Sequence, residues 1–197
     1  SQTAIYNMAI GMVGGTRCTS TSDASVEVTV LNEIWPMAVD DTIAGRDWSF
    51  ARKIALLVPV PDPLILLGQN RACFALPVDN AAMRQVSDST DFDPDDAYEW
   101  EIQERTIIVA DSAPSAVLWA QYTKQLREPA FFDGPFVSCI VARLAAELAI
   151  PITNSKSTFE MLWNLYAKRL TASSTHNGMQ GKNRRFARGK LSRAHGR

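Results

Sequence analysis

The chain has 197 residues, of which 46% are hydrophobic and 21% charged, a composition typical of a folded globular protein. Prolines and Asp62 interrupt its longest apolar stretch, residues 54–67, so we expect no membrane-spanning helix and no membrane partner. Cys18, Cys73 and Cys139 lie far apart without CxxC spacing, which favours buried free thiols over disulfides or a zinc site.

Charge is distributed unevenly along the sequence. The last 20 residues hold seven basic side chains and no acidic one, while the other 177 hold 13 basic and 21 acidic side chains, a net charge of −8. The sequence therefore predicts an acidic body with a basic tail. The opening residues lack the basic region of a secretion signal, so we expect a cytoplasmic product.

Two helices are predicted in the first quarter of the sequence. Residues 3–13 are mostly apolar and run into a glycine pair, which permits the turn that closes a helix. Residues 24–44 repeat apolar side chains every three or four positions. Pro36 lies inside this second pattern, so we expect a kink or a break near residues 32–35. The expected N-cap and stop of the second helix are Ser22 or Asp23, and Gly45.

The middle of the sequence changes to short β-type runs separated by Asp, Asn, Ser and Pro clusters, as in a meander or a small sandwich. Residues 48–57 begin as helix or strand and then meet a series of prolines. The acidic stretch 88–104 predicts a hairpin or a solvent-facing loop. The predicted strands are residues 74–77, 83–86, 100–103, 106–110 and 116–122.

Helical periodicity returns near the end. Residues 135–149 place apolar side chains on one face, and Pro151 marks the expected stop. Residues 155–172 predict a last helix, with Thr153 or Asn154 as its cap. Beyond position 173 the apolar periodicity is lost, so an extended segment is expected.

The order of these elements predicts an α+β fold, a four-helix bundle with an inserted small antiparallel β domain and an extended basic C-terminal tail. Residues 1–47 and 134–172 would form the bundle, and residues 48–133 the β-rich insertion projecting from one end. Residues 173–197 would form the C-terminal arm.

The sequence offers few residues for catalysis. Its two histidines, His176 and His195, both fall in the segment expected to be unstructured, which excludes a histidine-based hydrolase or metal site in the folded body. Neither a GxxxxGK[ST] loop nor a GxGxxG turn after a strand is present. We therefore expect no enzyme activity, no cofactor and no metal.

Adjacent carboxylates are the remaining catalytic candidates. Asp40 with Asp41, Asp95 with Asp96, and Glu99 with Glu101 could serve a hydrolase as paired acids, or could simply form solvated acidic loops. We favour the solvated loops. The aromatic residues Trp35, Trp48 and Phe50 stand near the end of the second helix, and we expect them to be a core cluster at its junction with the β region.

The basic arm has two functional interpretations beside the plain one, a disordered tail that serves only solubility. It would bind nucleic-acid phosphates without sequence preference, or dock on an acidic partner surface and fold there. Two apolar residues among the charges favour docking, because a partner pocket gives them a place to be buried. The residues of the expected docking or phosphate-contacting arm are Lys182, Arg184, Arg185, Phe186, Arg188, Lys190, Leu191, Arg193 and Arg197.

Several short motifs, taken in order, resemble one protein family. Trp48-Ser-Phe-Ala is followed by Leu76-Pro-Val-Asp and later by Leu144-Ala-Ala-Glu-Leu-Ala. Each motif is weak alone, but their order is similar to that of the head-to-tail adaptors of short-tailed bacteriophages, also called tail tubular protein A or neck adaptors. The similarity spans residues 4–172. Further matching segments are residues 7–11, 19–25, 130–136 and 151–153.

The resemblance implies a structural virion protein of the tail or neck, assembled in the host cytoplasm. It implies a homo-oligomeric ring, a dodecamer, attached below the portal protein and above the tail nozzle protein, with double-stranded DNA passing through its channel. The implied fold is a helical bundle with a β domain, and the implied C-terminal segment grips the portal. The arm matches no family motif, so its assignment rests on position and charge. We expect the helices to form the lateral contacts of the ring.

Overall fold

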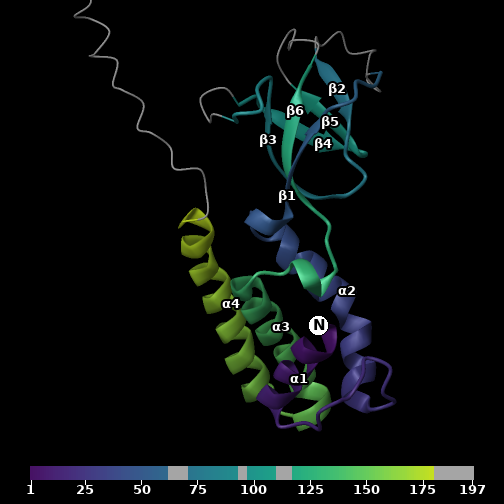
Figure 1. Ribbon diagram of the computed structural model, residues 1–197, viewed down its shortest axis with the longest axis vertical. Helices are drawn as coiled ribbons and strands as arrows, with labels where there is room; N and C mark the ends of the chain where they lie inside the picture. The colour runs from purple at the N-terminus through teal and green to yellow at the C-terminus, as the bar shows by residue number, and fades with distance from the viewer. Residues whose placement is uncertain (62–70, 93–96, 110–116, 180–197) are drawn as a thin grey trace, which may run out of the picture.

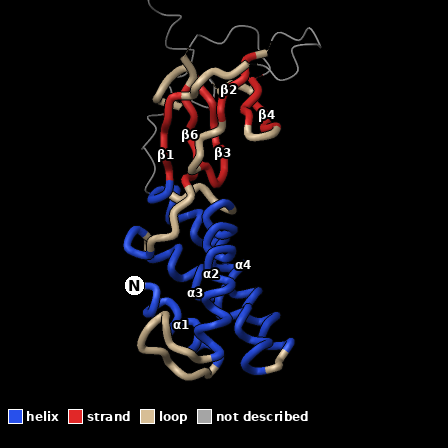
Figure 2. The backbone as a smooth tube through the Cα atoms, turned by 90° about the vertical axis from the view of Figure 1, so that its right-hand side faces the viewer, coloured by secondary structure: helices blue, strands red, loops and turns tan. Residues whose placement is uncertain are grey.

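Helices and strands occupy opposite ends of the molecule (Figures 1 and 2). The computed structural model describes residues 1–61, 71–92, 97–109 and 117–179. Four helices and two small antiparallel sheets make up this part of the chain, so the predicted α+β class is confirmed. The helices are α1 (Gln2–Val13), α2 (Val26–Ala44), α3 (Gly134–Thr153) and α4 (Lys156–Met179).

Hydrogen bonds at the helix ends explain where α1 and α2 begin and end. Gly14 closes α1 in the left-handed conformation at φ 73°, which glycine adopts without a steric penalty. The N-cap of α2 is Ser25, whose hydroxyl accepts a bond from Val28 N–H, so the predicted cap at Ser22 or Asp23 is wrong. Asp23 instead holds the preceding loop by accepting bonds from Thr19.

Two prolines lie inside helices that were expected to break or stop at them. α2 is assigned as helix without interruption across Pro36, so the expected break is absent. Pro151 falls in the last turn of α3, which continues to Thr153 and ends at Asn154 in the left-handed conformation. The predicted stop at Pro151 is therefore wrong. Both helices keep enough packing on their buried faces to offset the loss of one backbone bond each.

The last helix is longer than predicted. Its first free N–H groups are satisfied by Ser155, whose Oγ accepts from Thr158 N–H at 3.2 Å, so neither Thr153 nor Asn154 is the cap. α4 then continues to Met179. The expected start of the extended arm at residue 173 is therefore wrong, and His176 belongs to a helix. The remainder of the arm, residues 180–197, lies outside the described residues.

α3 is the central helix of the helical part. α1, α2 and α4 each pack against it, and in Figure 1 it lies between α2 and α4. By length and composition it is also apolar enough to cross a membrane, although most of this stretch is buried among the other helices. Its position is that of a core helix. Its buried residues are Phe136, Cys139, Ile140, Val141, Ala142, Leu144, Ala145, Ala146, Leu148 and Ala149.

The β part consists of two three-stranded antiparallel sheets with strand orders β1-β6-β3 and β2-β5-β4. A second apolar core fills the space between them. Backbone bonds join the sheets on two sides: Val60 N–H donates to Cys73 O and Ala75 N–H to Val58 O, both at 2.9 Å, and Tyr98 N–H donates to Val86 O at 2.9 Å. The strands are β1 (Arg52–Leu56), β2 (Ala72–Ala75), β3 (Asn80–Ser87), β4 (Trp100–Gln103), β5 (Thr106–Val109) and β6 (Trp119–Lys124).

The acidic stretch forms part of a tight hairpin. β4 and β5 pair with Gln103 opposite Thr106, leaving a two-residue loop. Both loop residues, Glu104 and Arg105, have positive φ values of 45° and 64°, as a type I′ turn requires. The predicted strands 100–103 and 106–110 therefore pair as a hairpin, to which the acidic stretch 88–104 contributes only residues 100–104, while residues 93–96 lie outside the described part.

An aromatic cluster lies where the chain passes between the two parts. Trp48 is fully buried and meets Phe136 edge-on, with ring centroids 5.0 Å apart. Phe50 contacts both Phe132 and Phe136, and Trp35 contacts Phe132. The expected core cluster at this junction is confirmed. Its members come from α2, from the entry into β1 and from the return into α3, so it joins all three segments.

Candidate interaction surface

The basic arm is the site that the sequence analysis favoured. Lys182, Arg184, Arg185, Phe186, Arg188, Lys190, Leu191, Arg193 and Arg197 all lie outside the described residues. Its role in docking or phosphate contact therefore stays a prediction. The described chain ends at Met179, the last residue of α4, at the end of that helix nearer the sheets in Figure 1.

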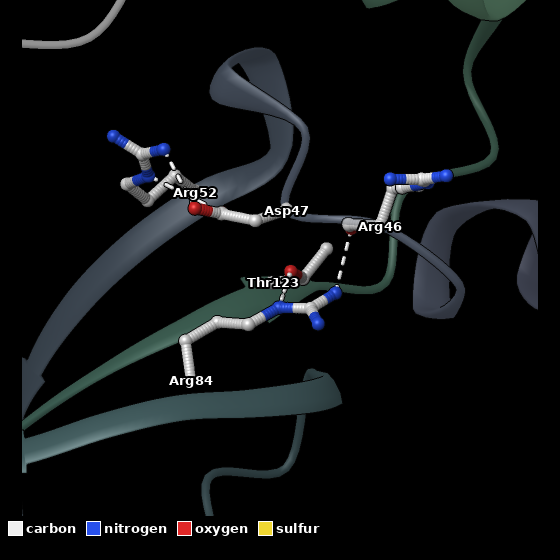
Figure 3. A network of polar contacts seen from close by, with 5 residues as sticks. All are labelled: Arg46, Asp47, Arg52, Arg84 and Thr123. Atoms are coloured by element: carbon white, nitrogen blue, oxygen red, sulfur yellow. Dashed lines mark hydrogen bonds and ion pairs between the residues drawn. The ribbon is translucent and has the colours of Figure 1, made fainter. Parts of the chain in front are cut away.

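Arg84 on β3 ties the β part to the C-terminal end of α2 (Figure 3). Its Nε donates to Thr123 Oγ1 at 2.9 Å. Its Nη2 donates to the carbonyl oxygens of Ala44 at 3.0 Å and Arg46 at 2.6 Å. A helix C-terminus leaves such carbonyls unpaired and favours a cation beside them. Burial lowers the pKa of Arg84, and nearby Asp47 opposes this effect.

A second tie joins α2 to the segment that leads back from the sheets to the helices. Arg127 donates through Nε and Nη2 to the two carboxylate oxygens of Asp40, at 2.9 and 2.5 Å, and Gln125 donates to the same carboxylate at 2.9 Å. These bonds hold the pKa of Asp40 below its ordinary value, and the bond from Arg127 has the largest effect. The neighbouring Asp41 instead faces Arg143 at 3.7 Å. The two carboxylates therefore serve separate ion pairs.

A third polar cluster lies within the β part. Asp79 accepts a bond from Tyr122 Oη at 2.7 Å and pairs with Lys53 Nζ at 2.7 Å. Burial alone would raise the pKa of Asp79, but the bonds from Lys53 and Tyr122 outweigh it and lower the pKa. The arrangement fixes the start of β1 against β6. All three groups are engaged with one another, which suits a structural role.

The other carboxylate candidates form no enclosed site in the described part of the chain. Glu99 and Glu101 are exposed, and Glu101 accepts a bond from Gln103 at 3.0 Å. Asp95 and Asp96 lie outside the described residues. Within residues 1–61, 71–92, 97–109 and 117–179, no three His, Cys, Asp or Glu side chains gather where they could hold a metal ion.

An apolar groove lies between α1 and α4. It has a volume of about 580 Å³, and its lining contains one charged residue, Lys168. Met161, one of its lining residues, is 60% exposed. Such a surface suits a protein partner, because methionine adapts its shape to what it contacts. The lining residues are Met12, Met161, Leu162, Asn164, Leu165 and Lys168.

Sequence reasoning missed both the groove and the Arg84 contact. A lone arginine in a strand gives no sign that it will reach carbonyl groups forty residues away in the chain. The groove had a weak signal: Met8 and Met12 stand four positions apart on a helix that contains no charged residue. Met8 itself is 47% exposed.

Comparison with known proteins adds no relative. No protein-family model matches the sequence, and no curated protein matches it.

Proposed function

We propose that this protein is a structural subunit of a short-tailed bacteriophage, an adaptor that forms a ring between the portal and the tail nozzle and lines the DNA channel. One observation carries the proposal: motif residues that resemble the adaptor family, though far apart in sequence, meet at the junction of the two parts. Trp48 and Phe50 come from one motif, and Phe132 and Phe136 from another, and all four rings are in contact.

The distribution of charge supports this role. A channel through which DNA slides has to avoid tight phosphate contacts, and a body with a net charge of −8 meets that need. The seven basic residues are confined to the last 20 positions, where they are available for a partner surface. We assign the arm to the portal, with Phe186 and Leu191 supplying apolar contacts.

The test is co-sedimentation of the purified protein with the portal protein of its phage. Removing residues 180–197 leaves all of α4 in place, so the truncated protein is expected to fold normally and to lose binding to the portal. Two further variants separate the contributions of the arm: Arg184, Arg185 and Arg188 changed to Gln, and Phe186 and Leu191 changed to Ser. A truncated protein that joins the portal with undiminished affinity refutes the assignment of the arm.

A second function, binding of nucleic acid through the arm, is favoured by the same basic residues. It predicts DNA binding that weakens steeply with salt, with roughly one counterion released per phosphate contact. The acidic body opposes it, because it repels DNA at low salt. The adaptor proposal would give way to nucleic-acid binding under two conditions. The protein would have to bind DNA in a way that the truncation abolishes, and it would have to show no association with the portal.

A further inference from the structure

The outward face of α1 is apolar and carries no charge. α1 has no Asp, Glu, Lys or Arg anywhere in its 12 residues. Ala4, Met8 and Gly11 are exposed and follow one another at helical spacing, so they share one face. A side chain placed at Gly11 would meet no atom within 4 Å. Nothing in the described chain covers this face.

The groove between α1 and α4 continues that apolar surface. Met12 on α1 lines it together with Met161 and Leu165 on α4, and Lys168 stands at one end. Lys168 is exposed and has no ion-pair partner among the described residues. An apolar groove with one unpaired cation fits a helix that carries an apolar side chain next to a carboxylate.

The same chain carries such a helix face on α2. Glu33, Met37 and Asp41 follow at four-residue intervals and are all exposed, and Met37 is 53% exposed. No ion-pair partner of Glu33 is found in the described part of the chain, so it complements Lys168. α2 and α4 lie on opposite sides of α3 (Figure 1). Complementary surfaces on opposite sides of one subunit produce head-to-tail association.

We infer that α2 of one copy packs into the α1/α4 groove of the next copy. Met37 enters the groove between Met12, Met161 and Leu165, and Glu33 pairs with Lys168. This inference rests on the proposed ring and names the surfaces that would close it. It also explains why α1 leaves Met8 and Gly11 uncovered, since the neighbouring copy would cover them.

Disulfide cross-linking tests the contact directly. Changing both Met37 and Met161 to Cys puts one thiol on each surface, and mild oxidation of the assembled ring is expected to give a ladder of covalent oligomers. The single variants Met37→Cys and Met161→Cys are matched controls that cannot extend beyond a dimer. The three natural cysteines are free and buried, so they add no background in the folded protein.

Charge reversal is the second test. Glu33→Lys and Lys168→Glu are each expected to weaken self-association by about 2- to 5-fold, the range of an exposed ion pair, and together to restore it. Met37→Asp is expected to weaken it by at least about 10-fold, because it places a charge in the apolar groove. Lys156→Glu, on an exposed lysine outside the groove, should change little.

The outcomes separate the inference from the proposed function. A wild-type protein that associates neither with itself nor with the portal overturns both. A wild-type ring that forms normally, while the double-cysteine variant gives no ladder and the paired reversal restores nothing, overturns this contact alone. A ladder from the double-cysteine variant only, with restoration by the paired reversal, supports it.

Discussion

Replacing Arg84 by methionine tests how the two parts of the molecule are joined. The change keeps much of the aliphatic volume but removes three hydrogen bonds, to Thr123 Oγ1, Ala44 O and Arg46 O. Hydrogen bonds to a charged group contribute about 1.5–3 kcal/mol each when buried. Water will reach part of this site, so we expect a loss of about 2–4 kcal/mol in the free energy of unfolding.

Urea unfolding followed by tryptophan fluorescence and by far-UV circular dichroism measures that loss. Arg52→Met is the matched control, because Arg52 forms a partly exposed pair with Asp47 in the same view (Figure 3), and such pairs contribute about 0–1 kcal/mol. Arg84→Lys keeps the charge near the end of α2 but loses the forked geometry of the guanidinium group. Its loss of unfolding free energy should therefore fall between those of Arg84→Met and Arg52→Met. If Arg84→Met is no more destabilising than Arg52→Met, the reasoning is refuted.

Three further outcomes are expected. Trp48→Ala should cost about 3–5 kcal/mol of unfolding free energy by urea titration, and Trp48→Phe clearly less, because only part of the buried ring is lost. The pKa of Asp40 is lowered in the folded protein, so its stabilising effect is present above the ordinary pKa of about 3.9 and is lost as pH falls through the pKa of the folded state. Asp40→Asn should therefore reduce the loss of unfolding free energy at acid pH, and an unchanged loss contradicts this. Burial raises the pKa of Cys139 to about 11, so a thiol reagent at pH 8 should label all three cysteines in urea and leave Cys139 unlabelled in the native protein.

Local pattern was enough to predict most of the regular elements. The four helices and the strands from β2 to β6 arise from periodicity and from turn residues, which act within a few positions. Proline misled the prediction at Pro151, and the break considered at Pro36 is absent. Pro36 and Pro151 each cost a helix one backbone bond, but α3 buries ten side chains against its neighbours, and tertiary packing of this kind outweighs a local penalty.

The candidate surfaces were harder to predict because they depend on distant partners. Arg84 finds the end of α2 about forty positions away, and no property of β3 indicates that contact. The groove combines Met12 with Met161, which lie about 150 positions apart in the sequence. The aromatic cluster was predicted because Trp48 and Phe50 stand close together in sequence, whereas its other members, Phe132 and Phe136, are supplied by the far side of the insertion.

The position of the β part between α2 and α3 affects how the protein is made. α1 and α2 leave the ribosome first, but α3, against which both pack, starts only at Gly134. Roughly ninety residues separate Ala44 from that point, which at about 5–20 residues per second amounts to about 4–20 s of synthesis. During this interval the sheets can complete their own hydrogen bonds, while the apolar sides of α1 and α2 still lack a partner. The helical core is therefore the last part of the protein to close.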